Sequence, residues 1–317
     1  LFQVDMCKPA AITLGNRVVG ELAKVIGALS RISKFTESAS LAEFRTAFSE
    51  RWEDREVPLA DVLDEESGIG FERARGPGSE GSPLLAKLAF PAGRGEARTN
   101  LRPLDALLLR KLGEPEIVLD PKELDALAGD TEPARLPDAF STMIRVAAAD
   151  DGELVLFEGT SGPSGARILG RFCHLSPEID AMTRAHHAAE EALRPDAVFA
   201  EIVHLNEGRI GNILCRPVLR AYEIVYLGVS GAPLDHQLTL DDLLVSVRGD
   251  RIVLRSRRLG REVIPRMSTA HNYRLRSLGV YRFLCALAGQ GTEQVGFSWG
   301  PLQGSPYLPR VRIGRVI

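Results

Sequence analysis

The sequence predicts a mixed α+β fold with short, largely antiparallel strands. Helices are expected to dominate residues 1–130 and strands to dominate residues 139–317. Residues 13–33 carry their apolar side chains at helical spacing, in one stripe. From residue 198 onward, apolar side chains come in short runs divided by turn residues, which is typical of strands. Helices and strands that segregate along a chain in this way favour the α+β class.

Composition places the chain among ordinary globular proteins. Of its 317 residues, 44% are hydrophobic and 26% are charged, and the net charge of −3 excludes a polycation. The four cysteines include no CxxC pair, which argues against a disulfide framework or a zinc module and fits a reducing cytoplasm. We find no signal peptide and no apolar run long enough to span a membrane, so a cytoplasmic protein is expected. No linker longer than residues 73–83 interrupts residues 1–317, so we expect one continuous domain fragment.

Capping patterns mark the first helices. Thr13 is a candidate N-cap for the helix at 13–33. Ser40, with Glu43 three residues later, forms a capping-box pattern for a helix at 40–52. Further elements before residue 130 are expected as helices at 101–113 and 121–128 and a strand at 117–119.

A hairpin and a glycine-rich loop occupy the middle of the chain. Residues 140–148 and 153–157 predict two strands joined at Asp150-Asp151-Gly152. The loop GTSGPSG at 159–165 follows, and then a short periodic stretch that carries Arg171. A strand, a Gly/Ser loop and a helix-like start can hold an anion on backbone N–H groups. The alternative is a surface turn with an arginine on its flank, because such loops are common connectors.

The next predicted helix, at 177–193, has Ser176 as its cap and carries two histidines and two glutamates. The four residues are His186, His187, Glu190 and Glu191. A His and a Glu four residues apart share a face, so a metal pair is conceivable. No third ligand is evident nearby, and we therefore favour a solvated polar face and predict no metal.

Strands are expected after this helix at 199–204, 210–215 and 222–225, followed by a hairpin at 243–247 and 252–254 and a helix at 280–288. Gly249-Asp250 supplies the turn of the hairpin. We find no phosphate loop of the GxxxxGK[ST] type, no GxGxxG and no GxSxG. Acyl or phosphoryl transfer would therefore need a substrate that is activated elsewhere, or a site without a short signature.

Charge is distributed unevenly. Ten acids and three arginines lie between Glu43 and Glu72, whereas ten arginines, two acids and no lysine lie between Arg248 and Arg282. Arginine suits planar, bidentate contact with phosphate, so the second segment is a candidate RNA-facing surface. The alternative is that these arginines pair with the acidic segment inside the fold. The candidate RNA contacts are Arg255, Arg257, Arg258, Arg261 and Arg266, with His271, Asn272 and Tyr273 as neighbouring stacking and hydrogen-bonding groups.

Several stretches together resemble the lantibiotic dehydratases, in the amino-terminal glutamylation half of those large enzymes. The stretches are LFQVDM (1–6), REVPLADVLDEESGIGF (55–71), GRFCH (170–174), AEIVHLNEGRIGNILCRPVLRAYEI (200–224), LTLDDLLVSVRGDRIVLRSRRLGREVIPR (238–266) and LPRVRIGRV (308–316). They follow the family's order across nearly the whole chain, and residues 73–150 match least. The family's leader-recognition and elimination domains are not recognised in residues 1–317, so we expect little activity from this fragment alone.

The resemblance implies transfer of a glutamyl group from glutamyl-tRNA to Ser or Thr hydroxyls of a precursor peptide. A separate carboxy-terminal domain of the family then eliminates glutamate and leaves a dehydroamino acid. A carboxylate whose acid has a pKa of roughly 4 is a far better leaving group than hydroxide. The tRNA ester already supplies the activation, so no cofactor is expected beyond glutamyl-tRNA as co-substrate. A lanthionine cyclase and a second copy of the chain are further candidate partners.

Two residues match family positions implicated in glutamylation. The resemblance implies that Asp5 orients the attacking hydroxyl or the donor's amino group, or acts as a base. It implies that Arg171 binds the glutamyl carboxylate or a terminal tRNA phosphate by a fork contact. Two alternatives stay open, namely a peptide aminoacyl-tRNA ligase-like enzyme of the same family and a non-catalytic RNA- or peptide-binding scaffold. A metal hydrolase built on His186 and His187 ranks last.

Overall fold

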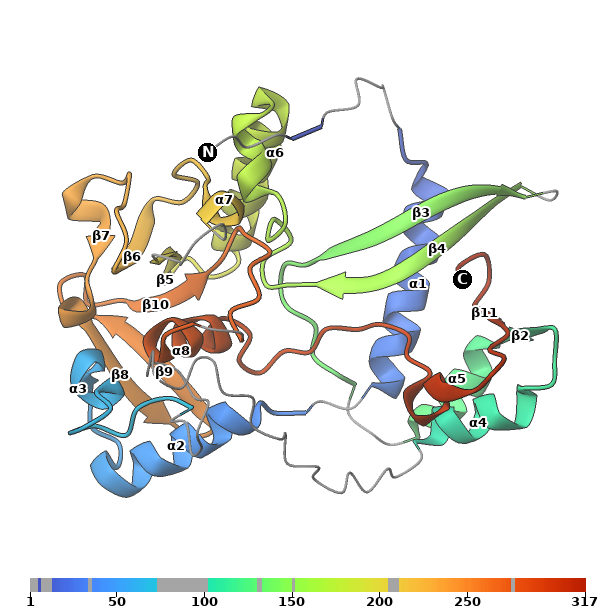
Figure 1. The fold of residues 1–317 in the computed structure, drawn as a ribbon, viewed down its shortest axis with the longest axis horizontal. Helices are drawn as coiled ribbons and strands as arrows, with labels where there is room; N and C mark the ends of the chain where they lie inside the picture. Colours follow the sequence, from blue (N-terminus) through green and yellow to red (C-terminus); the bar gives the residue numbers. More distant parts are fainter. Residues whose placement is uncertain are drawn as a thin grey trace, which may run out of the picture.

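The α+β class is confirmed by the computed structural model, in which two hydrophobic clusters organise two lobes (Figure 1). The larger lobe holds a mixed sheet, and among the described residues the smaller lobe holds three α-helices beside a long hairpin. The structure describes residues 5–6, 13–33, 36–72, 102–129, 133–149, 152–204, 211–274 and 277–317.

The sheet of the larger lobe combines antiparallel and parallel pairing. Among the described residues seven strands form it, in the order β1-β8-β9-β10-β5-β6-β7. Strands β1, β8, β9 and β10 pair antiparallel, whereas β10, β5, β6 and β7 pair parallel, so the carboxyl ends of these last four meet at one edge. The strands are β1 (Val57–Pro58), β5 (Ala197–His204), β6 (Tyr222–Tyr226), β7 (Gln237–Leu238), β8 (Leu243–Arg248), β9 (Arg251–Ser256) and β10 (Glu262–Arg266).

Helices cover both faces of this sheet. One face packs against α2 (Ala39–Trp52), α3 (Leu59–Leu63) and α8 (Gly279–Ala288), where Phe44 and Phe283 meet with ring centroids 4.6 Å apart. The other face carries α6 (Pro177–Ala192), which reaches the strands through charged side chains. Short elements of this lobe are α7 (Gly211–Leu214) and the 3₁₀ helices η1 (Gly170–His174), η3 (Leu234–His236) and η4 (Leu240–Asp242).

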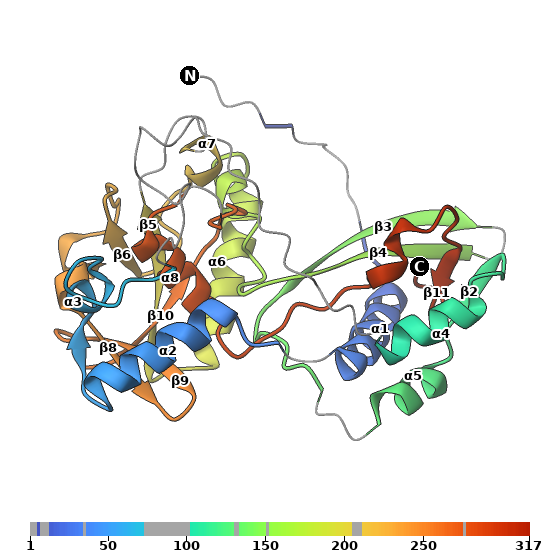
Figure 2. The same cartoon turned by 60° about the horizontal axis from the view of Figure 1, so that its bottom comes forward.

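The smaller lobe buries a second apolar cluster beneath the hairpin formed by β3 (Ser141–Ala149) and β4 (Gly152–Ser161) (Figure 2). Val155 of β4 lies in that cluster and forms a bridge with Val316 near the end of the chain. After β4 the chain continues to η1, so it passes here from the smaller lobe to the larger one. The remaining elements are α1 (Asn16–Ile32), α4 (Pro103–Lys111), β2 (Glu116–Val118), α5 (Pro121–Ala128), η5 (Gly300–Gly304) and β11 (Arg310–Arg312).

Most local predictions agree with these elements. Both hairpins form, and Gly249 takes a φ of +62° at the β8–β9 turn, a region that favours glycine. The Ser176 hydroxyl accepts from the amide of Ile179, as expected of an N-cap. Residues 73–83 and 1–4 lie outside the described residues.

Three local predictions are corrected. The strand expected at 210–215 is wrong, because residues 211–214 form the short helix α7, while residue 210 lies outside the described residues. The first helix has Gly15, not Thr13, at its N-cap. The second begins one residue before Ser40, with Ser38 in the cap position.

No helix among the described residues is both long enough and apolar enough to cross a membrane.

Candidate functional site

Arg171 and Asp5 form an ion pair that joins the start of the chain to η1. The Nη2 atom of Arg171 donates to Oδ1 of Asp5 at 2.6 Å. Both side chains are largely shielded, with 27% of Arg171 and 11% of Asp5 exposed. The Arg171 guanidinium carbon also lies 5.0 Å from the centre of the Phe172 ring. The structure therefore brings the two predicted residues together, while their roles stay predictions.

The Arg171 guanidinium retains unused donor capacity. Its Nε is buried and has no hydrogen-bond partner among the residues that the structure describes. A buried donor without a partner is costly. A carboxylate or phosphate that approached this guanidinium would satisfy that donor, because both ions accept paired N–H bonds from arginine.

The backbone amides before Arg171 are already used inside the protein. The amides of Ala166, Arg167, Leu169 and Gly170 donate to the Ser164 hydroxyl, the Ser164 carbonyl, the Ala166 carbonyl and the Ser268 carbonyl, respectively. Residues 163–170 thus form a turn that presents Arg171, as the second interpretation expected, but residues 162–166 are buried and the turn does not lie at the surface. These four amides are not available as the anion cradle that the Gly/Ser loop suggested.

Beside this turn, three charged residues stand in one row across the sheet. Arg266 of β10, Glu201 of β5 and Glu223 of β6 are register partners, so their side chains share one face of the sheet. Arg216 bridges the two carboxylates, with Nε 3.2 Å from Glu201 and Nη1 2.8 Å from Glu223.

The two carboxylates of this row are buried, and the charge of Arg216 compensates them in large part. Glu201 and Glu223 are each 1% exposed. Burial by itself lowers the pKa of Arg216, but the attraction of Glu201 and Glu223 outweighs it, so the pKa of Arg216 is raised. The pair of like charges on adjacent strands is therefore stable only with the arginine between them.

A second buried cluster fixes α6 to the sheet. Glu190 accepts from the Arg266 Nε at 2.8 Å and also from Arg220. Burial tends to raise the pKa of Glu190, but Arg266 and Arg220 outweigh it, so the pKa is lowered and the carboxylate stays ionised. Arg220 also pairs with Glu191 at 2.6 Å. These contacts make the polar face of α6 part of the protein interior.

The prediction that this face of α6 is solvated is therefore wrong. His187 is 2% exposed and Glu190 is 2% exposed. Burial and then Arg220 lower the pKa of His187 to about 3, so this imidazole is neutral at physiological pH. Within the described ranges no group of three metal-binding side chains forms. Glu190 and Glu191 bind arginines of the same chain, and His187 lies 3.4 Å from the Ser268 hydroxyl.

Some of the arginines between 248 and 282 pair with the acidic segment, as the second interpretation of the charge pattern expected. Arg255 contacts Glu56 at 2.7 Å, and Arg282 contacts Glu72 at 3.1 Å. Arg266 is only 8% exposed and is held by Glu190. The prediction that Arg266 lies on an RNA-facing surface is therefore wrong, because its side chain lies inside the fold.

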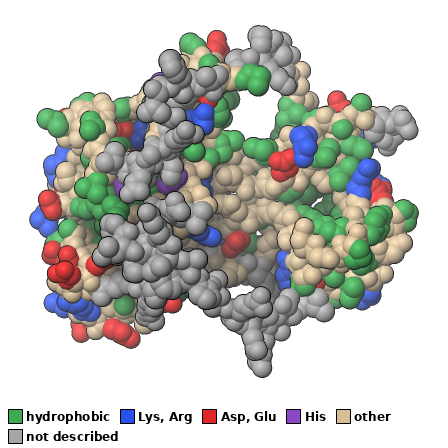
Figure 3. Space-filling view, viewed as in Figure 1, with side chains coloured by type: hydrophobic (Ala, Val, Ile, Leu, Met, Phe, Trp, Pro, Cys, Tyr) green, Lys and Arg blue, Asp and Glu red, His purple; other side chains and the backbone are tan. Residues whose placement is uncertain are grey.

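Three of the predicted RNA contacts are exposed, and none of them forms an ion pair with another residue that the structure describes. Arg258 donates to the carbonyls of Asp235 and Gln237, and Arg261 donates to those of Pro195, Asp196 and Ala197. Carbonyl acceptors carry no net charge, so both cations keep theirs. The side chain of Arg257 is exposed. On the face shown in Figure 3, basic and acidic side chains of the larger lobe are interspersed.

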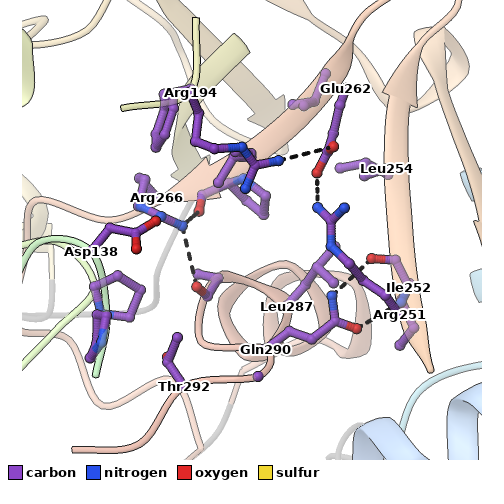
Figure 4. Close-up of a pocket in the computed structure, with 18 of the residues that line it drawn as sticks. Asp138, Arg194, Arg251, Ile252, Leu254, Glu262, Arg266, Leu287, Gln290 and Thr292 are labelled. Atoms are coloured by element: carbon purple, nitrogen blue, oxygen red, sulfur yellow. Dashed lines mark hydrogen bonds and ion pairs between the residues drawn. The ribbon is translucent and has the colours of Figure 1, made fainter. Parts of the chain in front are cut away.

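Two cavities lie near these elements. The first, of about 530 Å³, is drawn in Figure 4 and has the Arg194–Glu262–Arg251 ion pairs on one wall and Arg266 on another. None of its lining residues belongs to residues 5–6 or η1, so it is separate from the Asp5–Arg171 pair. The second, of about 940 Å³, is lined in part by Arg167 and by the predicted stacking group: His271, Asn272 and Tyr273.

Sequence reasoning missed the residues that support the site. Glu201 and Glu223 are single carboxylates in apolar strands. Arg216 and Arg220 lie between two predicted strands, and Ser268 carries no local signal. A single charged residue within an apolar strand is therefore the sequence signal that could have identified Glu201 and Glu223.

Comparisons with known proteins agree with the resemblance. The family model described as "Lantibiotic dehydratase, N terminus" matches residues 1–317. The crystal structure of the tRNA-dependent lantibiotic dehydratase MibB from Microbispora sp. 107891 is similar, with 30% identity and a TM-score of 0.77. The match covers 95% of this chain but only 30% of MibB. A search among curated proteins found no significant match.

The glutamylation domain TbtB, from thiomuracin biosynthesis, is also similar. Its identity is 21% with a TM-score of 0.51, and the match covers 95% of this chain and 37% of that one. The same domain bound to 5'-phosphodesmethylglutamycin matches with 22% identity, a TM-score of 0.51 and the same coverage. At this identity the likeness shows the fold alone.

Proposed function

The chain belongs to the lantibiotic dehydratase N-terminus family, and from this premise we propose that it transfers glutamate from glutamyl-tRNA to Ser and Thr hydroxyls of a ribosomally made precursor peptide. The transfer prepares dehydration to dehydroamino acids in the biosynthesis of a lantibiotic-type peptide. Because the chain spans 30% of MibB, the site belongs to a larger protein in this proposal. The observation that carries it is the contact between Arg171 and Asp5.

The proposed chemistry is the exchange of one ester for another. The peptide hydroxyl oxygen forms a bond to the glutamyl carbonyl carbon, and the ester bond to the tRNA ribose breaks. The hydroxyl proton leaves toward a base, and the departing ribose oxygen regains a proton. The energy of the ester is retained, so neither a nucleotide nor another cofactor is consumed. The protein needs only to position the reacting groups and to stabilise the charge that develops in the transition state.

Arg171 is proposed to hold an anionic group of the donor. Its buried Nε and its fork geometry suit the glutamyl side-chain carboxylate or the terminal phosphate of the tRNA. Asp5 already accepts from the Nη2 of this guanidinium, so it orients Arg171 before the donor arrives. We propose that the same carboxylate orients the attacking hydroxyl or receives its proton.

The tRNA is proposed to contact the exposed arginines beyond strand β9. Arg257, Arg258 and Arg261 keep their positive charge at the surface, whereas Arg255 is paired with Glu56. Phosphates are recognised by such uncompensated cations, and the affinity falls with salt. Because charged tRNA and newly made peptides meet in the cytoplasm, we place the reaction there. A lanthionine cyclase and a homodimer stay predictions.

The test uses the intact protein that carries this chain, with glutamyl-tRNA and its precursor peptide, and measures the peptide by mass spectrometry. We expect either a mass increase of one glutamyl residue per modified hydroxyl, removed by mild alkaline hydrolysis as for an ester, or, where the glutamate has already been eliminated, the loss of one water per hydroxyl. Arg184→Ala is the matched control, because Arg184 forms an exposed pair with Asp180 on α6. Binding of tRNA and peptide without any change in peptide mass would support the scaffold instead. An added amino acid at the end of the peptide would support the ligase.

A further inference from the structure

Arg171 is anchored to the sheet through its neighbour, Gly170. The amide of Gly170 donates to the carbonyl of Ser268 at 2.8 Å. The approach is so close that a Cβ at residue 170 would overlap the Ser268 carbonyl oxygen. A glycine is therefore required here by contact and not by a special backbone angle. The position of η1, and with it Arg171, depends on where Ser268 lies.

Ser268 is in turn fixed by one carboxylate. Its amide donates to Oε1 of Glu201 at 2.5 Å, and its hydroxyl donates to Oε2 of the same residue at 2.8 Å. Both residues are 1% exposed. Glu201 stands on β5, with β10 on one side and β6 on the other. Arg216 at 3.2 Å offsets its charge. This two-pronged contact leaves Ser268 little freedom to move.

We propose that Glu201 and Ser268 are positioning residues for Arg171, so that the chain Glu201–Ser268–Gly170 sets where its guanidinium meets the donor. The inference rests on the role proposed for Arg171 above. Neither residue touches the donor in this proposal. Each acts through backbone placement, and the acyl-transfer step itself is unchanged. The expected consequence is that the loss of the Ser268 hydroxyl costs rate only where Arg171 is present.

The first arm of the test measures the anchor without any reaction. Hydrogen–deuterium exchange of the intact protein follows peptides that contain residues 168–174. In Ser268→Ala the exchange of the Gly170 amide should accelerate by about twofold to tenfold, the range for one lost hydrogen bond of modest net strength. Ser246→Ala removes another buried hydroxyl, 2% exposed on β8, and should leave these peptides unchanged. Unchanged exchange in Ser268→Ala would overturn the proposal.

The second arm measures coupling to Arg171 in the transfer reaction. In the native background, Ser268→Ala should lower the transfer rate by about tenfold with little change in the KM for the peptide. In an Arg171→Lys background the same substitution should cost less than about twofold, because the group it positions has changed. Equal losses in both backgrounds would overturn the proposal. If the intact protein transfers no glutamate at all, the proposed function fails, and the exchange arm still decides on the anchor.

Discussion

The Nη2 of Arg171 lies 2.6 Å from the Oδ1 of Asp5, although 166 positions separate the two residues in the chain. The pair lies beside the edge where parallel strands end, because the Gly170 amide is bonded to Ser268, just after β10. Each residue can orient the other, and each has a further proposed role, Arg171 in binding the donor and Asp5 in receiving a proton. Substitutions that keep the shape of the side chains separate these roles.

Asp5→Asn should distinguish a base from an orienting group. An amide keeps the shape and can still accept a hydrogen bond from Arg171, but it cannot take up a proton. If Asp5 is the base, transfer should fall by about a hundredfold or more, in line with a lost general base. If Asp5 only orients, the loss should stay near tenfold. Single-turnover transfer measured across pH 5 to 8 checks this.

Arg171→Ala should abolish glutamyl transfer while the fold is retained, because alanine has no N–H donors for the fork contact. Arg171→Lys keeps the charge but loses the paired donors, and should retain only a small part of the rate. Circular dichroism and a thermal melt confirm folding, and mass spectrometry of the peptide measures transfer. Turnover that is unchanged in Arg171→Ala would remove this residue from the mechanism.

Arg220→Met should strongly destabilise the larger lobe. The side chain of Arg220 is fully buried and compensates Glu190, so its loss leaves a carboxylate short of partners. We expect the free energy of unfolding to fall by about 3–5 kcal/mol. Arg184→Ala, which breaks the exposed pair with Asp180, should change it by less than about 0.5 kcal/mol. Urea denaturation of both variants at pH 7 checks this, and similar losses would contradict the structural role of Arg220.

His187 should make stability depend on pH below neutrality. Its pKa falls from an ordinary value of 6.5 to about 3 in the fold, so the unfolded chain binds the proton more readily. Stability that is fully present above pH 6.5 is therefore lost as the pH falls toward 3, by up to about 1.4 kcal/mol per pH unit.

The His187 effect is isolated by comparison with His187→Gln, which cannot titrate. Between pH 6.5 and pH 5 the native protein should lose about 1.6 kcal/mol more than the variant, because the unfolded chain is already half protonated at pH 6.5. Urea denaturation at the two pH values gives both losses, and the other titrating groups cancel in the difference. Equal losses would show that His187 is not held neutral by burial.

Arg257→Ala should weaken the binding of tRNA to the same extent whatever the nucleotide sequence of the tRNA. An exposed cation that contacts one phosphate should, when removed, reduce the slope of log affinity against log salt by about 1. Arg110→Ala removes a similarly exposed arginine from α4 in the smaller lobe and should leave the slope unchanged. Filter binding between low and moderate salt measures both. An identical slope for Arg257→Ala and the native protein would place the tRNA elsewhere.

Local structure could be predicted well from the sequence. The β8–β9 hairpin followed from Gly249-Asp250, and the start of α6 followed from Ser176. In both cases the signal lies within a few residues of the element that it determines. The direction of strand pairing could not be predicted in this way. Side chains alternate between the two faces of a sheet in both parallel and antiparallel strands.

The environment of charged residues was harder to predict. The glutamates of α6 look solvated in the sequence, and only Arg220 and Arg266, far along the chain, make their burial tolerable. The uneven charge pattern correctly suggested that acidic and basic segments meet, as Arg255 and Glu56 do. It could not show which arginines stay exposed, because that depends on the register of β9 and β10.

The ion pair with Asp5 has a practical consequence for anyone who expresses pieces of this protein. A recombinant piece that starts at Asn16 would keep every residue of both hydrophobic clusters. It would give a normal melting curve and a normal spectrum, yet it would lack the acid that faces Arg171. A well-behaved sample is therefore no guarantee of a whole site, and cloning boundaries should be drawn upstream of residue 5.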